Sequence, residues 1–206
     1  MKRKRRSTYH HGNLRQALID ASLDVIAELG AEQFTLRDVA RRVGVAPSAA
    51  YRHFADKEEL LTSVATECAQ RLGKAMDDAA AASADWSERF RNSGIAYVRF
   101  AVEHPAHFRV LNLPSLAERL PLRAGVEDWM QHEIAELTRA RAAGQLADLP
   151  IEHMMLAARA LTYGLSRLIV DAQDGLGDIG VERAVALADA ITNVLGVGLL
   201  PRQRSQ

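Results

Sequence analysis

The chain has 206 residues, of which 48% are apolar and 25% are charged, a composition typical of a folded globular protein and not of a disordered chain. This length allows either one large domain or a small domain beside a larger one. The formal net charge is zero, which excludes a uniformly basic or uniformly acidic protein.

Basic side chains are concentrated near the N-terminus. Residues 1–60 carry 11 basic and 8 acidic side chains, whereas the remaining residues carry 15 and 18. The basic run 2–6 is the kind of segment that is usually just solvated, but it also suits an arm that contacts phosphates. No stretch of about eighteen uncharged apolar residues is present, and no apolar stretch follows the basic run, so we expect a cytoplasmic protein without a membrane span. The single cysteine, Cys68, is expected to be a small buried apolar residue.

Helical periodicity dominates from Asn13 onward, and the alternation typical of strands is almost absent. The first predicted helix has apolar residues at steps of three and four from Leu14 to Leu29 and ends at Gly30, and Asn13 with Gln16 resembles a capping box. Capping residues, prolines and glycines then predict three more helices, which run from Thr35 to Gly44, from Pro47 through Tyr51 and Phe54, and from Asp56 to about Ala82.

The second part of the chain contains long amphipathic segments separated by proline and glycine. Helices are predicted over 86–103, over a segment from 118 or 122 to 143, over 151–174 and over 181–197. The fold class is therefore all-α. We expect a small helical domain over residues 1–60 and one packed helical bundle over 61–206, with no internal repeat.

Two of the short predicted helices are joined by the turn Gly44-Val45-Ala46. Ala40 lies where the two helices would cross closely, and this spacing matches the helix-turn-helix, whose second helix enters the major groove of DNA. An ordinary helical hairpin remains the alternative on spacing alone. Thr35 and Lys57 favour the first interpretation, because each sits at a helix start where free backbone N–H groups bind anions.

Three segments resemble the TetR family of transcriptional regulators. They are Tyr9-His-His-Gly-Asn-Leu-Arg15, Phe34-Thr-Leu-Arg-Asp-Val-Ala-Arg-Arg-Val-Gly-Val45 and Tyr51-Arg-His-Phe-Ala-Asp-Lys-Glu-Glu-Leu60. The resemblance implies an N-terminal helix-turn-helix domain, a long fourth helix leading to a variable ligand-binding domain, and a dimer formed by the two C-terminal helices. Ala46 departs from the family, in which serine or threonine often caps the recognition helix.

By position, Thr35 and Lys57 resemble phosphate contacts, Tyr51 a contact to the backbone or to a thymine methyl, and Ser48, Ala49 and Arg52 base-reading residues. Tyr51 as a core residue and His53 as a plain surface residue remain open alternatives on geometry. The full set of expected DNA-binding residues is Thr35, Arg37, Ser48, Ala49, Tyr51, Arg52, His53 and Lys57.

The second domain resembles a C-terminal domain type named for a Trp-His-Gly signature, through His104-Pro-Ala-His-Phe-Arg109 and Leu161-Thr-Tyr-Gly-Leu-Ser-Arg-Leu168. The signature is degraded, because Tyr163-Gly164 stands where His-Gly is expected. Aromatic and methionine side chains are candidates for lining an effector pocket, with an ordinary core as the alternative. These candidates are Tyr97, Phe100, Phe108, Trp129, Met130, Met155 and Tyr163.

A metal site is conceivable at two places, around His104 and His107 or around His132, Glu133 and Glu136, but no third clear ligand converges on either, so we expect no metal and no cofactor. The glycine pattern of 175–180 follows no strand and is interpreted as a loop between helices. Apolar residues on the last two predicted helices are expected to form the bundle core and a subunit interface: Leu161, Leu165, Leu168, Ile169, Val185, Ala188, Ile191 and Leu195.

These patterns predict a ligand-responsive transcriptional repressor that binds a palindromic duplex operator as a homodimer and is released by an unknown small-molecule effector. A helical binding module that no longer contacts DNA is the first alternative. An enzyme is the second, and it is disfavoured because the chain has no G-x-S-x-G, P-loop or H-E-x-x-H motif and no convincing pairing of a nucleophile with a base.

Overall fold

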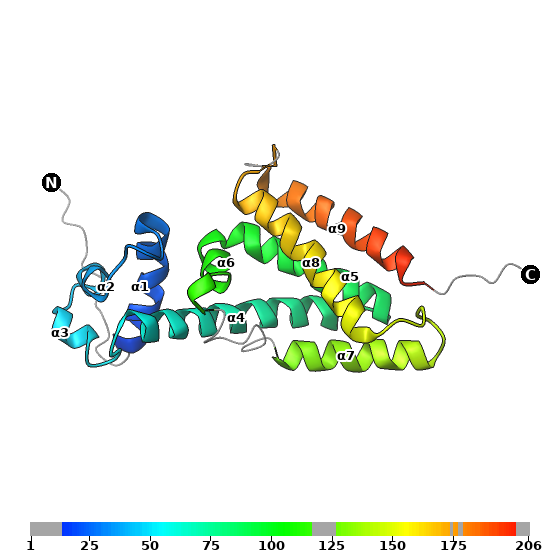
Figure 1. Ribbon diagram of the computed structural model, residues 1–206, viewed down its shortest axis with the longest axis horizontal. Coiled ribbons are helices and arrows are strands. Elements are labelled where there is room, and N and C mark those ends of the chain that lie inside the picture. The colour runs from blue at the N-terminus through cyan, green and yellow to red at the C-terminus, as the bar shows by residue number, and fades with distance from the viewer. Residues whose placement is uncertain (1–13, 117–126, 174, 177–178, 201–206) are drawn as a thin grey trace, which may run out of the picture. The chain divides into compact units, whose positions relative to one another are not determined.

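The computed structural model describes residues 14–116, 127–173, 175–176 and 179–200 (Figure 1). Within these ranges the secondary structure is helical, with no strand, in agreement with the predicted fold class. The elements are α1 (Leu14–Leu29), α2 (Leu36–Val43), α3 (Pro47–Ala50), α4 (Lys57–Ala81), α5 (Trp86–Glu103), α6 (Pro105–Leu111), the 3-10 turn η1 (Pro114–Leu116), α7 (Glu127–Ala142), α8 (Ile151–Val170) and α9 (Gly180–Gly198).

The chain divides into two compact units, Met1–Val64 and Ala65–Gln206, and the division falls inside α4. The first unit contains α1, α2, α3 and the first turns of α4. Its core is formed by side chains that are almost completely buried: Leu18, Val25, Phe34, Val39, Ala40, Phe54, Leu60 and Val64. Burying this many apolar groups is the main stabilisation available to so small a unit.

The second unit is organised around α5, which packs against α8 and α9 and also contacts α6 and α7. In Figure 1, α8 and α9 run alongside each other and α5 passes beneath them. One core cluster joins Val98 of α5 to Ile169 and Ala188 of the last two helices, and another joins Phe90 to Leu137 and Met154. These two clusters hold α5, α7, α8 and α9 together as one bundle.

Most helix boundaries agree with the sequence prediction, and the differences have local causes. The recognition segment is helical only over Pro47–Ala50 and continues as a turn, in which the N–H groups of His53 and Phe54 both donate to the Ala50 carbonyl. α8 stops at Val170, four residues before the predicted end, and Ala172 then adopts a positive φ of 54°. The short helix α6 was not anticipated; it begins at Pro105, a favourable first helical residue.

The starts of two predicted helices lie outside the described residues. Asn13 and the segment 117–126 lie outside them, so neither the proposed cap of α1 nor the beginning of the predicted 118–143 helix is seen. Gln16 uses its amide to donate to Asp20 at 3.1 Å, one turn further along α1. Among the described residues, no helix is both long and apolar enough to cross a membrane.

Candidate functional site

The turn between α2 and α3 has the geometry that the helix-turn-helix pattern predicts. Gly44 ends α2 with a φ of 82°, a left-handed conformation that glycine adopts without strain. The backbone N–H groups of Gly44 and Val45 both donate to the carbonyl of Ala40, each at 2.9 Å. Ala40 is completely buried, so its small side chain lets the two helices approach closely. The turn therefore fixes α3 at a defined angle to α2.

The start of α2 is held by a reciprocal capping box between Thr35 and Asp38. The Thr35 hydroxyl accepts from the Asp38 N–H at 3.2 Å and donates to its carboxylate at 2.7 Å, while the Thr35 N–H donates to the same carboxylate at 3.0 Å. The hydrogen bonds from Thr35, together with Arg41, lower the pKa of Asp38 and outweigh the opposing effect of desolvation. Thr35 remains exposed, but its hydroxyl hydrogen is already used within the protein.

Along α3 and the turn after it, one side of the segment is buried and the other is exposed. Ala50 and Phe54 are buried in the core of the first unit and fix the segment in place. Tyr51 is 49% exposed, which excludes the alternative that it is a core residue. Ala49 is half-buried, and the other expected contacts of this segment are exposed: Ser48, Arg52 and His53. The exposed side of the recognition segment thus presents hydroxyl, phenol, guanidinium and imidazole groups to a partner.

The start of α4 is capped by Asp56, whose carboxylate accepts from the Glu59 N–H at 2.7 Å, while the Glu59 carboxylate accepts from the Ala55 N–H at 2.7 Å. Lys57, the first helical residue, is only partly exposed. Its ammonium donates to the carbonyl of Glu32 at 2.6 Å and lies 4.8 Å from the centroid of the Phe34 ring. The cation is therefore held at the α4 N-terminus in a defined position.

Two arginines outside the predicted set also shape this unit. Arg15 of α1 lies 5.0 Å from the centroid of the Phe54 ring and donates to the Ser63 hydroxyl at 2.8 Å, which joins α1 to the first turns of α4. Arg42 of α2 forms an ion pair with Glu28 of α1. Sequence reasoning missed both supporting contacts because they join helices whose relative placement the sequence does not give. Arg37, which was expected to contact DNA, is exposed on α2.

In the second unit, five of the seven expected pocket residues lie near one another. Phe108 is in contact with Tyr97 and Tyr163, at centroid distances of 6.3 and 6.0 Å, and Tyr97, Phe100 and Trp129 pack around one buried cluster with Leu72 and Met76. Met155 packs elsewhere, with Phe90 and Leu137, and Met130 is half-buried. Burial raises the pKa of Tyr97 to about 12, so its hydroxyl stays neutral at physiological pH.

The two expected histidine groups behave differently. His104 and His107 lie with ring centroids 5.1 Å apart against Phe100, and Arg71 lies 3.3 Å from the His107 ring nitrogen. Burial, His104 and Arg71 together lower the pKa of His107. His132 is exposed and points toward Asp77, at 3.6 Å, whereas its neighbour Glu133 is buried. No group of three metal-ligating side chains converges within the part of the chain that the structure describes.

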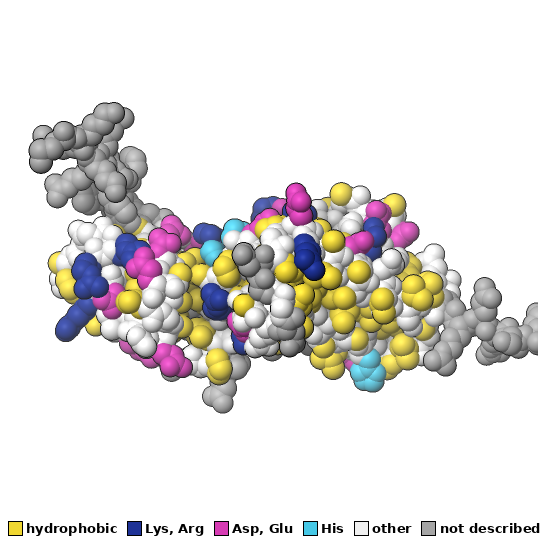
Figure 2. All heavy atoms as spheres, turned by 90° about the horizontal axis from the view of Figure 1, so that it is seen from above, with side chains coloured by type: hydrophobic (Ala, Val, Ile, Leu, Met, Phe, Trp, Pro, Cys, Tyr) yellow, Lys and Arg dark blue, Asp and Glu magenta, His cyan; other side chains and the backbone are white. Residues whose placement is uncertain are grey.

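The outer side of α8 and α9 is strongly apolar, and Figure 2 shows hydrophobic side chains gathered over these helices. The most exposed are Leu156 at 62%, Val194 at 75% and Val197 at 67%. Beside them is a groove of about 510 Å³, with a lining that includes Leu161, Ile191 and Leu195 from the expected interface set. An exposed apolar patch of this kind marks an interaction surface more often than a free surface.

The remaining expected interface residues lie deeper. Leu165, Ile169 and Ala188 are buried in the core shared with α5, while Leu168 and Val185 are half-buried. The sequence prediction missed Leu156, Val194 and Val197. Each of the last two helices has one apolar face in the core and an adjacent apolar face on the surface, and periodicity alone does not distinguish the two faces.

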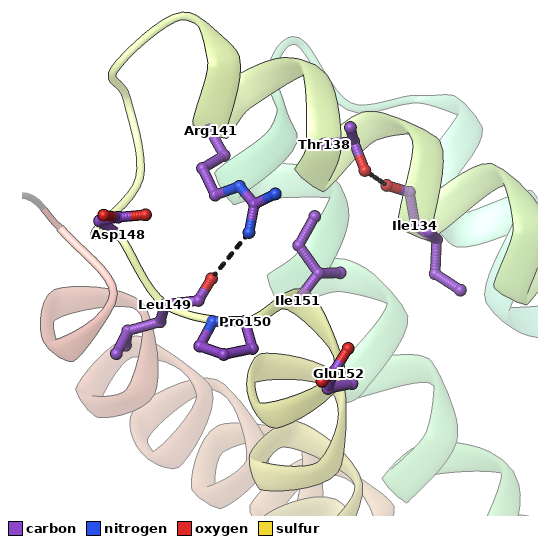
Figure 3. A pocket seen from close by; sticks show the side chains of 8 residues that line it. All are labelled: Ile134, Thr138, Arg141, Asp148, Leu149, Pro150, Ile151 and Glu152. Atoms are coloured by element: carbon purple, nitrogen blue, oxygen red, sulfur yellow. Dashed lines mark hydrogen bonds between the residues drawn. The ribbon is translucent and has the colours of Figure 1, made fainter.

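A second depression, of about 520 Å³, lies where α7 turns into α8 (Figure 3). Arg141 donates across it to the carbonyl of Leu149 at 3.2 Å, and the Thr138 hydroxyl donates to the carbonyl of Ile134 at 2.7 Å. These polar groups already bond within the protein, so we interpret the depression as the outer surface of the connection between α7 and α8.

The helix-turn-helix region matches a family model. Residues 18–64 match the model described as bacterial regulatory proteins, tetR family. The match covers the buried core of the first unit, the Gly44 turn, the recognition segment and the capped start of α4. Residues 18–64 thus have the sequence of a DNA-binding domain of the tetR family, and the fold of the whole chain is similar to that of solved TetR-family regulators.

Solved structures share the fold over nearly the whole chain. A protein of unknown function from Rhodococcus sp. RHA1 is 27% identical, with a TM-score of 0.75, and the match covers 95% of this chain and 100% of that one. The fatty acid degradation regulator FadR from Bacillus halodurans is 19% identical, with a TM-score of 0.74 and coverage of 96% and 100%. FadR from Bacillus subtilis, solved with stearoyl-CoA, is 21% identical, with a TM-score of 0.71 and coverage of 89% and 98%.

Proposed function

We propose that this protein is a transcriptional repressor that binds a palindromic duplex operator as a homodimer and releases it when a small molecule binds the second unit. The observation that carries the proposal is the recognition segment, in which buried Ala50 and Phe54 fix the backbone while Ser48, Tyr51 and Arg52 remain exposed. Arginine reads guanine by paired hydrogen bonds, and small residues at the helix start allow close approach to base edges.

Phosphate contacts would position this segment on the duplex. The α4 N-terminus offers the positive end of the helix dipole, and Lys57 adds a cation held by Glu32 and Phe34. At the α2 N-terminus the N–H groups of Thr35 and Asp38 are bonded within the capping box, so the helix dipole and the exposed Arg37 would meet the phosphate there. Such contacts give affinity and register, whereas the recognition segment gives sequence preference.

Homodimer formation is supported by the exposed apolar side chains of α8 and α9. Leu156, Val194 and Val197 would leave water if the same faces of two chains packed against each other about a twofold axis. Each such side chain contributes on the order of 1.5 to 3 kcal/mol when it passes from full exposure to full burial. A twofold dimer would also present two recognition segments, which a palindromic site requires.

The effector proposal rests on the aromatic cluster of Tyr97, Phe100, Phe108, Trp129 and Tyr163. The structure of FadR from Bacillus subtilis holds stearoyl-CoA, so this fold accommodates a large small-molecule ligand. Because α4 is one continuous helix shared by both units, a ligand that repacks residues such as Leu72 or Met76 would bias the position of its N-terminal turns.

The experiment is a selection of genomic fragments with the purified full chain, followed by titration of the recovered duplex. We expect one enriched palindrome, with binding lost in Arg52→Ala and retained in Arg99→Ala, an exposed arginine of α5 outside the recognition segment. Enrichment of no sequence, together with absent binding at low salt, would instead favour a helical binding module that does not contact DNA.

A further inference from the structure

Glu133 is an acidic side chain in an environment that gives it no partner. It lies in the middle of α7 and is completely buried, with 0% of its surface exposed. Neither carboxylate oxygen has a hydrogen-bond partner among the described residues. Buried polar groups are nearly always hydrogen-bonded, because an unpaired one loses its water without compensation. A carboxylate buried in this way needs an explanation.

The polar groups around Glu133 come from facing sides of α7 and α5. Trp129 lies one turn before Glu133 on α7 and donates its indole N–H to the Ser93 hydroxyl of α5 at 3.2 Å. Arg89 lies one turn before Ser93 and donates through one terminal nitrogen to the carbonyl of Ala80 at 3.1 Å, while its Nε is buried and has no partner. Trp129 and Ser93 are thus bonded to each other, while Arg89 keeps one buried nitrogen unpaired, as Glu133 keeps both of its oxygens.

Two carboxylates and one guanidinium act on Glu133 among the described residues. The guanidinium of Arg89 has the largest effect of the three, and the carboxylates of Glu136 on α7 and Asp77 on α4 oppose it. Burial raises the pKa of Glu133 to about 7, with Arg89 opposing the shift and Glu136 and Asp77 adding to it. At slightly alkaline pH the group is therefore an ionised carboxylate that no cation among the described residues contacts.

An aromatic cluster lies close to this carboxylate, because Trp129 stands one turn before Glu133 on α7. Trp129 donates a hydrogen bond to Ser93 and also packs in the cluster of Tyr97, Phe100, Leu72 and Met76. An aromatic face attracts a cation, and an apolar wall takes up a hydrocarbon body. An anionic ligand would meet Glu133, Asp77 and Glu136, whereas a positively charged nitrogen would satisfy both carboxylate oxygens.

We propose that Glu133 is the polar anchor of the effector site and that the effector is an amine, with a protonated nitrogen on Glu133 and an aromatic or alkyl body against Trp129 and Phe100. This inference rests on the proposed function only in calling the ligand an effector. The binding of an amine can be measured without DNA.

The test uses phenylalkyl compounds with two to six methylene groups in three matched forms: primary amine, alcohol and carboxylate. Binding to the full chain is measured at pH 8 by tryptophan fluorescence and by the shift in melting temperature. We expect the best amine to bind at least about tenfold more tightly than its alcohol, and the carboxylate more weakly than either. Affinity for the amine should fall about tenfold from pH 8 to pH 6, as Glu133 becomes protonated.

Two variants distinguish an effect of Glu133 itself from an effect of the protein's overall charge. Glu133→Gln should bind amine and alcohol equally, whereas Glu152→Gln, an exposed glutamate of α8, should keep the preference for the amine. If Glu133→Gln fails to fold, Glu133→Asp and the pH profile of the wild type provide the readout. Equal binding of the three forms, a preference for the carboxylate, a preference for the amine that survives Glu133→Gln, or no binding of any form would each overturn the proposal.

Failure of the amine proposal and failure of the proposed DNA-binding function would be distinguishable. A protein that binds its selected operator but none of the amines loses only the ligand assignment. A protein that binds amines through Glu133 but no DNA keeps the site and loses the repressor function.

Discussion

The ammonium of Lys57 donates to the backbone carbonyl of Glu32 at 2.6 Å, which ties the start of α4 to the segment before α2. The same group lies 4.8 Å from the centroid of the Phe34 ring. Lys57 thus stabilises the first unit and also places a positive charge at a helix N-terminus, where the proposed function needs one.

Replacing Lys57 by alanine should therefore have two separable effects. The free energy of unfolding should fall by about 1 to 2 kcal/mol, because one charge-assisted hydrogen bond and one cation–π contact are lost. Operator affinity should also fall, and the slope of log affinity against log salt should decrease by about one. Denaturant titration and salt-dependent binding measure these effects. Lys74→Ala, at an exposed lysine of α4, is the control, and an unchanged salt slope in Lys57→Ala would remove Lys57 from the phosphate contacts.

Ala46 precedes α3 with φ −64° and ψ 142° and provides no side-chain cap. Serine has the same extended conformation available at a helix N-cap and would accept from a free backbone N–H. Ala46→Ser should raise the free energy of unfolding of the first unit by about 0.5 to 1 kcal/mol, measured by thermal or denaturant unfolding. Ala46→Val, which adds bulk without an acceptor, should give no gain; a gain equal to that of serine would argue against capping as the cause.

Some features of this fold could be predicted from the sequence and others could not. Thr35, Gly44, Pro47, Asp56 and the helix ends they define were predictable, since each acts through its own local backbone. The buried state of Glu133 was not, although its position was noted, because burial depends on which face of α7 meets α5. The same limit explains why Val194 was missed and why the sequence did not say whether Ala188 serves the core or the subunit interface.

Glu133 should make stability depend on pH in a definite direction. Its pKa is raised from 4.5 to about 7 by burial, so the folded protein holds the proton more tightly than the unfolded chain does. Stability is consequently lost as pH rises from about 4.5 through about 7, by about 3 kcal/mol for this group. Relative to wild type, Glu133→Gln should unfold at a higher denaturant concentration at pH 8 than at pH 5. The same wild-type-to-variant difference at both pH values would contradict this assignment.

Gly94 lies where α5, α8 and α9 meet. A methyl group on Gly94 would come within 2.8 Å of Thr192 Cγ2 and 3.3 Å of Thr162 Cγ2. Gly94→Ala should therefore destabilise the second unit by about 1 to 3 kcal/mol through overpacking. Thr192→Ser removes the nearer methyl and keeps a hydroxyl to donate to the Ala188 carbonyl, as threonine does at 2.8 Å. The double variant should recover part of the loss in a thermal unfolding measurement; strictly additive effects would show that the two positions do not compete for space.

Val194 is 75% exposed on the apolar side of α9, so an aspartate there should fold normally as a single chain. If this face forms the dimer, Val194→Asp places a charge in the interface and should weaken association by at least about tenfold, measured by sedimentation. Asn193→Asp adds the same charge at the neighbouring exposed position and serves as the control. An unchanged dimer in Val194→Asp would place the interface elsewhere.

The most direct measurement for the central claim is the native mass of the protein bound to its selected duplex, compared with a duplex in which one half-site is scrambled. The proposed function predicts two chains, or a multiple of two, on the intact palindrome. It also predicts a large loss of affinity for the half-scrambled duplex, and the same loss for Val194→Asp on the intact one. One chain per duplex, or equal affinity for intact and half-scrambled sites, would contradict symmetric operator binding by a homodimer.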